Sequence, residues 1–249
     1  MKVAGLVALI ILSVLLINQF IFKVANNSEK VYFLTSDGKK ISANFFRAEN
    51  PKGWLILSHM MPATKESWQE FAKEMQEFGY ESLAIDLRGH GESESGPDGY
   101  QNFSDAEHQA SIRDLEAGWE FLKSAGAAPE KTILAGASIG ANLSLEFFAR
   151  NTDFKKAVLL SPGFDYHGIK TEPLVVKLQK GRSLLFATSK DDGDNATEVL
   201  GLYKKSPKEL NKHIIIYDHG GHGTEMLKVR DELNLSEAIK KFLDYGTIN

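Results

Sequence analysis

A chain of 249 residues, 43% of them apolar and 25% charged, is long enough for one large globular core and is expected to form a single folded domain. Its formal charge of −4 provides no basic surface for a phosphate backbone, so we expect no nucleic-acid partner. The sequence has no cysteine, which excludes disulfides, thiolate metal sites and cysteine nucleophiles.

The N-terminal segment has the character of a membrane insert. Residues 3–17 are almost entirely apolar and follow Lys2. A charged start before such a run is typical of a secretory signal, but no small-x-small cleavage site follows. Roughly 20 apolar residues suffice to span a bilayer. We therefore expect residues 1–25 to be an uncleaved transmembrane signal anchor, with secretion after cleavage as the alternative. The domain over residues 26–249 is expected on the extracytoplasmic side.

The rest of the chain alternates short β-branched runs with amphipathic stretches, which indicates a mostly parallel sheet with helices on both faces. Residues 36–39, with the sequence Ser-Asp-Gly-Lys, predict a hairpin, so the sheet should begin antiparallel. Eight strands are predicted, at residues 31–35, 41–47, 54–59, 82–86, 132–137, 157–161, 184–188 and 214–217. Apolar residues at three- and four-residue spacing predict helices near 67–78, 105–124, 139–150, 195–204 and 236–243.

The first chemical signal is the sequence Gly-Ala-Ser-Ile-Gly at residues 136–140. It lies where a buried strand gives way to a helix. A turn in that position holds the serine in a strained conformation and lifts its hydroxyl clear of the sheet. Gly136 and Gly140 are required there because a Cβ at either would collide with the neighbouring strand and helix. Ser138 is therefore the predicted nucleophile, with a purely structural turn as the alternative.

A serine hydroxyl needs a base within hydrogen-bond reach. His222 lies on a glycine-rich loop after the last predicted strand, from which an imidazole can reach back over the strand ends. His219 is the rival base, but its position beside the strand favours contacts with local backbone groups. Asp218 could join these histidines around a metal, but no other cluster has matching spacing, and no metal site is predicted.

A third group should orient the imidazole and stabilise its charged form. Asp191 and Asp192 both follow the seventh predicted strand. We choose Asp191 from its distance past the strand end, and Asp192 is the alternative.

The chain order Ser138, Asp191, His222 on this strand pattern resembles the α/β-hydrolase superfamily, and the similarity covers nearly all of residues 31–245. Members that cleave esters or monoacylglycerols are the nearest in pattern. The resemblance implies an α/β-hydrolase fold. Only about twenty residues, 162–182, separate the sixth and seventh strands, so we expect no large cap domain and an open site.

Two further segments carry the resemblance. Residues 86–93, Asp-Leu-Arg-Gly-His-Gly-Glu-Ser, look like the family's loop after the fourth strand, and their histidine is expected to be structural. Residues 57–62, Leu-Ser-His-Met-Met-Pro, resemble its His-Gly-x loop. By that resemblance, the backbone amides of Met61 and Ile139 would form the oxyanion hole. The sequence departs from the family at Met60, where glycine is usual.

The resemblance implies a serine hydrolase that cleaves a small-molecule carboxylic ester through an acyl-enzyme and uses no cofactor. Thioesterases and serine peptidases use the same triad and stay as alternatives. A non-catalytic binding protein that retains the fold is the rival from another class, although the triad is complete in type and order.

Overall fold

The computed structural model describes residues 28–230 and 233–248. The predicted membrane segment over residues 1–25 lies outside the described residues. Within the described ranges, no helix has both the length and the apolar character needed to cross a bilayer.

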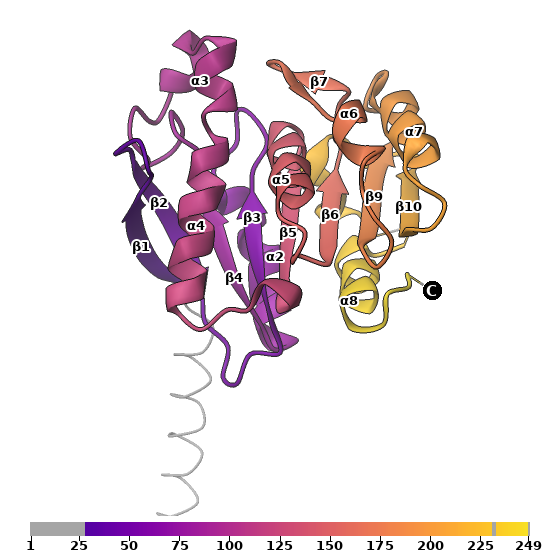
Figure 1. The fold of residues 1–249 in the computed structure, drawn as a ribbon, viewed down its shortest axis with the longest axis horizontal. Helices are drawn as coiled ribbons and strands as arrows, with labels where there is room; N and C mark the ends of the chain where they lie inside the picture. Colours follow the sequence, from indigo (N-terminus) through magenta and orange to yellow (C-terminus); the bar gives the residue numbers. More distant parts are fainter. Residues whose placement is uncertain (1–27, 231–232, 249) are drawn as a thin grey trace, which may run out of the picture.

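A mixed sheet of eight strands forms the centre of the domain (Figure 1). The strand order is β1-β2-β4-β3-β5-β6-β9-β10. β2 pairs antiparallel with β1 and β4, and the remaining pairs are parallel. The strands are β1 (Glu29–Leu34), β2 (Lys40–Phe46), β3 (Gly53–Ser58), β4 (Tyr80–Ile85), β5 (Thr132–Ala137), β6 (Lys156–Leu160), β9 (Ser183–Ser189) and β10 (Asn211–Tyr217). All eight predicted strands are thus confirmed, with their ends displaced by a few residues.

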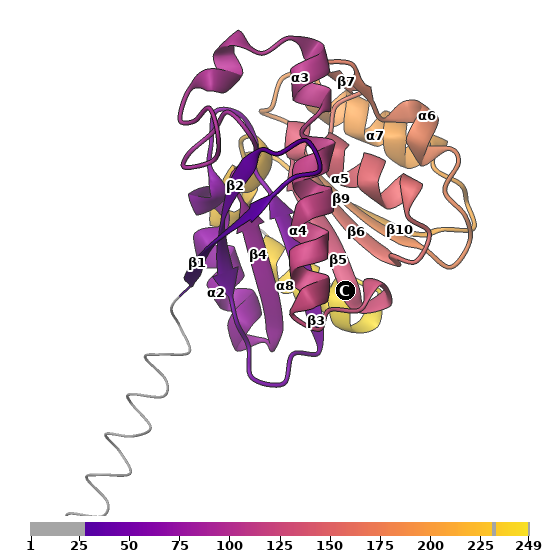
Figure 2. The same ribbon diagram turned by 60° about the vertical axis from the view of Figure 1, so that its left-hand side comes forward.

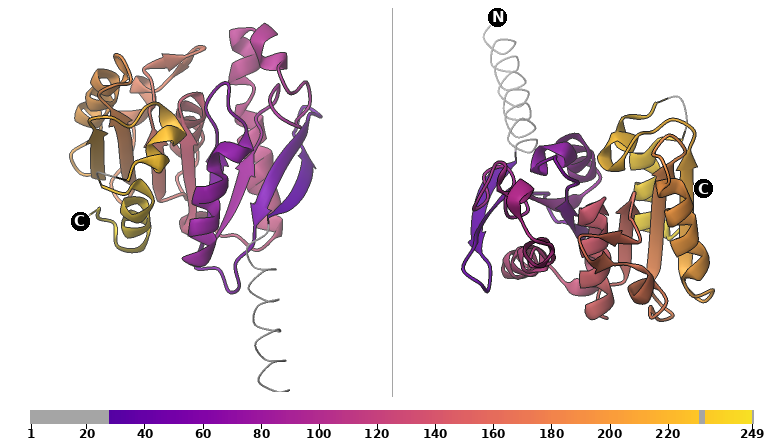
Figure 3. Two further views of the ribbon diagram at one scale, coloured as in Figure 1. Left: turned by 180° about the vertical axis from the view of Figure 1, so that it is seen from behind. Right: turned by 90° about the horizontal axis from the view of Figure 1, so that it is seen from above.

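Helices cover both faces of the sheet, as predicted. α4 (Ile112–Ser124), α5 (Ile139–Arg150) and α7 (Asn195–Lys205) lie on one face, in front of the sheet in Figure 1. α2 (Gln69–Glu77) and α8 (Leu235–Tyr245) lie on the other face, seen from behind in Figure 3.

Each face of the sheet has its own apolar core. Leu115 of α4 and Val199 of α7 belong to the first core, whereas Phe71 of α2 and Phe242 of α8 belong to the second. β3, β4 and β5 are buried along their whole length because both of their faces are covered. This buried centre holds the carboxyl ends of the strands in fixed positions, where the candidate site lies.

Two predicted helices differ in detail. The stretch 105–124 is divided into α3 (Asp105–Gln109) and α4, with the break at Ala110 and Ser111. The stretch near 67–78 begins as a 3₁₀ turn, η1 (Lys65–Trp68), before α2. Other 3₁₀ turns are η2 (Gly99–Asn102), η3 (Pro129–Lys131) and η4 (Gly223–Lys228).

The short segment between β6 and β9 contains no cap domain, as predicted. It forms a two-stranded hairpin of β7 (Asp165–Tyr166) and β8 (Ile169–Lys170), followed by α6 (Glu172–Val175). The two turn residues, His167 and Gly168, both have positive φ, which matches a tight hairpin turn. Figure 2 shows α3 and β7 above the same end of the sheet.

Candidate active site

Ser138 lies at the sharp turn between β5 and α5. Its φ and ψ of 54° and −123° belong to a region that non-glycine residues rarely adopt. The amide of Ser138 donates to the carbonyl of Leu160 on β6 at 2.8 Å, and the helix starts at the next residue. A strained serine at a strand-to-helix turn presents its hydroxyl at the carboxyl end of the sheet.

Close backbone approach explains the two glycines around Ser138. A Cβ on Gly136 would overlap the carbonyl oxygen of Gly140. A Cβ on Gly140 would lie 2.5 Å from the carbonyl oxygens of Ser58 and His59. Real Cβ atoms do not approach backbone atoms so closely. A larger residue at Gly136 would therefore force β5 and the start of α5 apart, and one at Gly140 would force the elbow away from the end of β3.

The loop after β10 brings His222 to the same end of the sheet. Gly223, the next residue, has a φ of 58°, which favours glycine. A Cβ there would lie 2.6 Å from Sδ of Met60 and 3.1 Å from Cβ of Ala137. The loop that carries His222 therefore packs directly against the residue before the nucleophile and against the predicted oxyanion loop.

Asp192, not Asp191, is the acidic partner of His222. Oδ2 of Asp192 lies 2.7 Å from Nδ1 of His222. A carboxylate accepts from a protonated Nδ1, which leaves Nε2 of the neutral imidazole with its lone pair. Both side chains are mostly shielded from water, at 15% and 31% exposure. The choice of Asp191 from the sequence is corrected in favour of the alternative.

Asp191 has a different position, and the reason is the path of the chain after β9. Its carboxylate accepts from the hydroxyl of Ser189 and from the amides of Gly220 and Gly221 at 3.2 Å and 3.1 Å. The Ser189 hydrogen bond, with help from the two amides, lowers the pKa of Asp191. His219, the rival base, is exposed, and its Nδ1 lies 3.9 Å from Oδ2 of Asp191. Both residues thus shape the glycine-rich loop.

The predicted oxyanion donors lie at the start of α5 and in the loop after β3. Ile139 is the first residue of α5, where a helix amide has no intrahelical acceptor. The Met61 amide donates to no other group within the described ranges. Met60 lies beside the His222 loop, since its Sδ faces Gly223 and accepts from the hydroxyl of Thr224 at 3.8 Å.

His59 holds the backbone of the predicted oxyanion loop. Its ring is fully buried, its Nδ1 donates to the carbonyl of Met60 at 2.9 Å, and its Nε2 accepts from the amide of Leu87 at 3.0 Å. Burial, with a contribution from His90, lowers the pKa of His59 to about 3. The neutral ring therefore links the loops after β3 and β4.

A buried ion pair joins the same two loops. Nζ of Lys65 lies 2.6 Å from Oδ2 of Asp86, and both side chains are almost completely inaccessible. The Lys65 amide and the Glu92 amide also donate to the Asp86 carboxylate, at 2.8 Å and 3.0 Å. This cluster connects Lys65 of η1 to the segment 86–93 and gives that motif a structural role beside the candidate site.

The histidine of that motif, His90, is also packed into this structural cluster. It is buried and stacks on the ring of Tyr100 with the centroids 4.1 Å apart. Its Nδ1 lies 3.1 Å from the carbonyl oxygen of Arg88, and its other face meets the edge of His59. These contacts agree with the structural role expected for His90.

Comparison with known proteins places this geometry in a family. A family model described as serine aminopeptidase, S33, matches residues 49–205, more than half of the chain. The chain belongs to this family of α/β hydrolases. The matched range contains Ser138 and Asp192 and ends before His222. No curated protein matches the sequence significantly.

The hydrolase shares its fold with several esterases of known structure. The esterase Pf2001 of Pyrococcus furiosus matches with a TM-score of 0.70 and 20% identity over 89% of this chain and 91% of that one. The esterase RhEst1 of Rhodococcus sp. ECU1013 matches with a TM-score of 0.68 and 16% identity over 87% of this chain and 98% of that one. The esterase EaEST of Exiguobacterium antarcticum matches with a TM-score of 0.67 and 12% identity over 86% of this chain and 99% of that one. The predicted α/β-hydrolase fold is therefore confirmed.

Tyr166, which belongs to no sequence motif, also lies at the candidate site of the hydrolase. Tyr166, on the β7–β8 hairpin, lies close enough to Ser138 for the serine hydroxyl to act on the pKa of its phenol, and Nδ2 of Asn195 lies 3.4 Å from its phenol oxygen. No sequence motif assigns a role to Asn195. The only available signal is its position at the start of α7, directly after the loop that carries Asp192.

The β7–β8 hairpin is tied to α3 across the top of the site. The ring of His167 stacks on that of His108 with centroids 3.9 Å apart. Nε2 of Gln109 donates to the His167 carbonyl at 2.9 Å, and Nδ1 of His167 lies 3.1 Å from Oδ1 of Asp105. These contacts fix the hairpin to α3.

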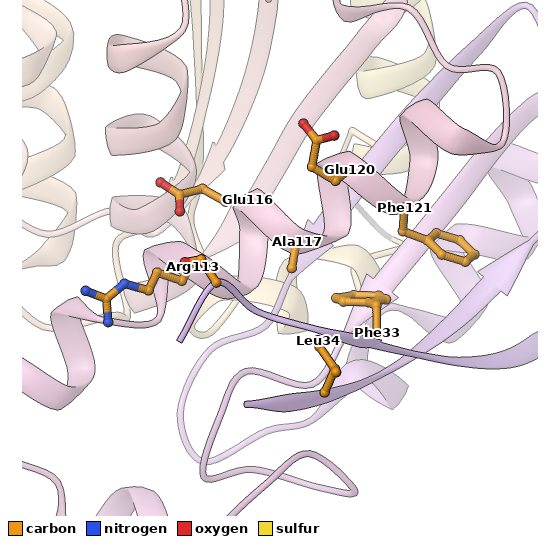
Figure 4. Close-up of a pocket in the computed structure, with 8 residues that line it drawn as sticks. Phe33, Leu34, Arg113, Glu116, Ala117, Glu120 and Phe121 are labelled. Atoms are coloured by element: carbon orange, nitrogen blue, oxygen red, sulfur yellow. The ribbon is translucent and has the colours of Figure 1, made fainter. Parts of the chain in front are cut away.

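A surface pocket of about 280 Å³ lies elsewhere, between β1 and α4 (Figure 4). Its apolar wall is formed by Phe33, Ala117 and Phe121, and Arg113 and Glu116 line its polar side. No serine–histidine–carboxylate set lines it. Within the described ranges, no group of three histidine or carboxylate side chains is arranged to hold a metal ion.

Proposed function

We propose that this hydrolase cleaves a carboxylic ester of a small molecule through an acyl-enzyme, with Ser138 as nucleophile, His222 as base and Asp192 as the acid of the triad. The observation that carries the proposal is the strained serine elbow at the same sheet end as a histidine whose Nδ1 is already held by a carboxylate. These are the parts that activate an otherwise weak hydroxyl nucleophile.

In the proposed reaction, Nε2 of His222 removes the proton of Ser138 as its Oγ attacks the ester carbonyl. The imidazolium that forms is stabilised by Asp192, and it then protonates the departing alcohol. A water molecule attacks the acyl-enzyme by the same route, releases the acid and restores Ser138. The amides of Ile139 and Met61 would donate to the oxyanion, because a helix-start amide and a loop amide without an acceptor are both available.

The test is hydrolysis by the purified full chain of p-nitrophenyl esters of increasing acyl length, together with labelling by a fluorophosphonate probe. Wild type is expected to hydrolyse short esters and to label, while S138A and H222A lose both. Tyr32→Phe, on the exposed outer strand, is the matched control and should retain activity. Labelling and turnover that survive in S138A would overturn the proposal. A wild type that neither labels nor hydrolyses would favour a binding role.

The peptidase alternative has one observation in its favour, since the matching family model is described as serine aminopeptidase. Aminoacyl p-nitroanilides therefore belong in the same assay, as do acyl thioesters. Ester hydrolysis that exceeds anilide and thioester hydrolysis in kcat/KM supports the esterase proposal. The reverse order would assign the site to peptides or thioesters, because leaving-group preference is set by the shape of the pocket.

We also propose that residues 1–25 anchor the enzyme in a membrane with the hydrolase domain on the extracytoplasmic side. The support is the apolar run after Lys2 and its length. The full chain is expected in the membrane fraction after an alkaline carbonate wash, and protease added to intact spheroplasts should digest the domain. Recovery in the soluble fraction would contradict the membrane anchor. Protection from the protease would contradict the extracytoplasmic side.

A further inference from the structure

Tyr166 is held at the site by the packing of its ring. A Cβ on Gly163 would lie 2.6 Å from the ring, so the aromatic face covers the Gly163 backbone directly. Gly163 itself is fixed, because its amide donates to Oδ1 of Asn142 at 3.1 Å and its carbonyl accepts from the hydroxyl of Thr171 at 2.6 Å. Asn142 lies on α5, the helix that begins beside the nucleophile.

The hairpin is anchored to that helix a second time. Nδ2 of Asn142 donates to the carbonyl of Ile169 on β8 at 2.9 Å, and Asn142 is fully buried. One asparagine therefore satisfies backbone groups on both sides of Tyr166. The phenol is held in register with the nucleophile by α5 itself.

The phenol oxygen of Tyr166 already has one donor. Nδ2 of Asn195 points to it at 3.4 Å and also donates to the carbonyl of Pro162 at 3.1 Å. The position of Asn195 is set by the Thr188 hydroxyl, which donates to its Oδ1 at 2.8 Å. The phenol donates to no acceptor among the described residues, so its hydrogen is available for a partner on the substrate side.

The charges around Tyr166 favour a neutral partner. Burial raises the pKa of the phenol and outweighs the opposing effect of the Ser138 hydroxyl. The nearby carboxylates of Glu198 and Asp192 act in the same direction as burial, so the hydroxyl stays protonated. The same two carboxylates would repel an anionic group at this position. A neutral oxygen acceptor is the group that satisfies the phenol hydrogen without that repulsion.

We infer that Tyr166 selects the substrate of this hydrolase: its ring, which packs on Gly163, closes the acyl side of the candidate site, and its hydroxyl donates to a neutral oxygen in the acyl chain. The inference rests on the proposed function, since it assumes an ester bound to Ser138. It names the substrate class more narrowly, as esters of short acids that carry an ether, hydroxyl or carbonyl oxygen near the scissile carbonyl.

The test compares two esters that differ by one atom. p-Nitrophenyl methoxyacetate and p-nitrophenyl butyrate have acyl chains of equal length, but one has an oxygen where the other has a methylene. The ratio of their kcat/KM values is measured for wild type and for Tyr166→Phe, which retains the ring and lacks the hydroxyl. Intrinsic reactivity of the two esters cancels between the enzymes.

The ratio is expected to fall by about threefold to tenfold in Y166F, through loss of the methoxyacetate rate, because one neutral hydrogen bond is removed. Y32F, with its exposed phenol on β1, should retain the wild-type ratio. An unchanged ratio in Y166F, with both esters still hydrolysed, would overturn the hydroxyl assignment and leave the esterase proposal standing. Wild type without any esterase activity would overturn both.

A second variant tests the ring. Tyr166→Ala removes the wall while Gly163, Asn142 and Asn195 stay in place, so kcat/KM for octanoate relative to butyrate is expected to rise by about tenfold or more. An octanoate-to-butyrate ratio equal to that of wild type would show that the ring does not close the acyl side. Fluorophosphonate labelling of Y166A verifies that Ser138 is still reactive.

Discussion

Oδ2 of Asp192 lies 2.7 Å from Nδ1 of His222, while the neighbouring Asp191 binds the Ser189 hydroxyl and the amides of the glycine-rich loop. Two adjacent aspartates after one strand therefore have separate tasks. One carboxylate orients the proposed catalytic base, and the other holds the loop that carries it.

Replacement of these two aspartates by asparagine should separate the tasks. In Asp192→Asn, an amide can stabilise the wrong tautomer of His222 and cannot stabilise the imidazolium, so kcat for a p-nitrophenyl ester should fall by a factor on the order of 10³ to 10⁴. Asp191→Asn retains an oxygen acceptor for Gly220 and Gly221 and should retain most of kcat. A large loss of kcat in D191N combined with near wild-type kcat in D192N would return the triad to the first choice made from the sequence.

Two glycines predict opposite changes in stability. Gly140→Ala places a Cβ 2.5 Å from the carbonyl oxygens of Ser58 and His59, so the free energy of unfolding should fall by about 3 kcal/mol or more. Gly118 is inside α4, and a Cβ there would meet Leu83 at an ordinary 3.4 Å. Gly118→Ala should therefore raise the free energy of unfolding by about 0.5 to 1 kcal/mol, because alanine is the better helix former.

Urea denaturation of both variants and wild type gives the comparison. Equal stabilities of G140A and wild type would show that the end of β3 can move away from the elbow without cost. Destabilisation in G118A would mean that the contact between α4 and the sheet is tighter than these distances indicate.

Local steric requirements explain why part of the site could be predicted from the sequence. The elbow needs small residues at positions 136 and 140, and the glycines that meet this need are visible directly in the sequence. His222 could be predicted because it lies on the loop after the last strand of the sheet. The strands were predicted for a similar reason, since β-branched runs bounded by turns are a local property.

The triad acid could not be chosen in the same way. β9 ends at Ser189, and the direction of each later side chain depends on how the loop turns toward β10. The Asp191 carboxylate accepts hydrogen bonds from the Ser189 hydroxyl and the loop amides. These tertiary contacts have no signature in the sequence. Tyr166 was equally hard to assign, because a strand of two residues has no alternation to detect. The break at Ala110 and Ser111 contains neither glycine nor proline.

The buried pair of Lys65 and Asp86 predicts a strong dependence of stability on one ammonium group. Lys65→Met leaves the Asp86 carboxylate buried without its cation, so the free energy of unfolding should fall by about 3 to 5 kcal/mol. Lys30→Met is the matched control, because Lys30 forms an exposed pair with Glu92, which also contacts Lys65. Little change is expected there, since exposed pairs contribute little. Chemical denaturation in which both variants lose equal stability would show that the Asp86 pair is not the important contact.

Two buried histidines predict a loss of stability in mild acid. Burial lowers the pKa of His59 to about 3, and burial together with the charge of His167 lowers that of His108 to about 4. The ordinary value is about 6.5. Between pH 6.5 and about 4 the unfolded chain therefore binds protons that the folded chain does not, and stability falls as the pH falls. Each histidine contributes a slope of up to about 1.4 kcal/mol per pH unit.

His108→Gln isolates one of these contributions, because His59 cannot be replaced without loss of the contact between the loops after β3 and β4. The free energy of unfolding of H108Q, measured at pH 7, 6 and 5, should fall less steeply with acid than that of wild type, by up to about 1.4 kcal/mol per pH unit. His219→Gln is the control, since that side chain is 87% exposed and should leave the slope unchanged. If H108Q and wild type lose stability in parallel, protonation of His108 is not coupled to unfolding, and the acid sensitivity must come from other groups.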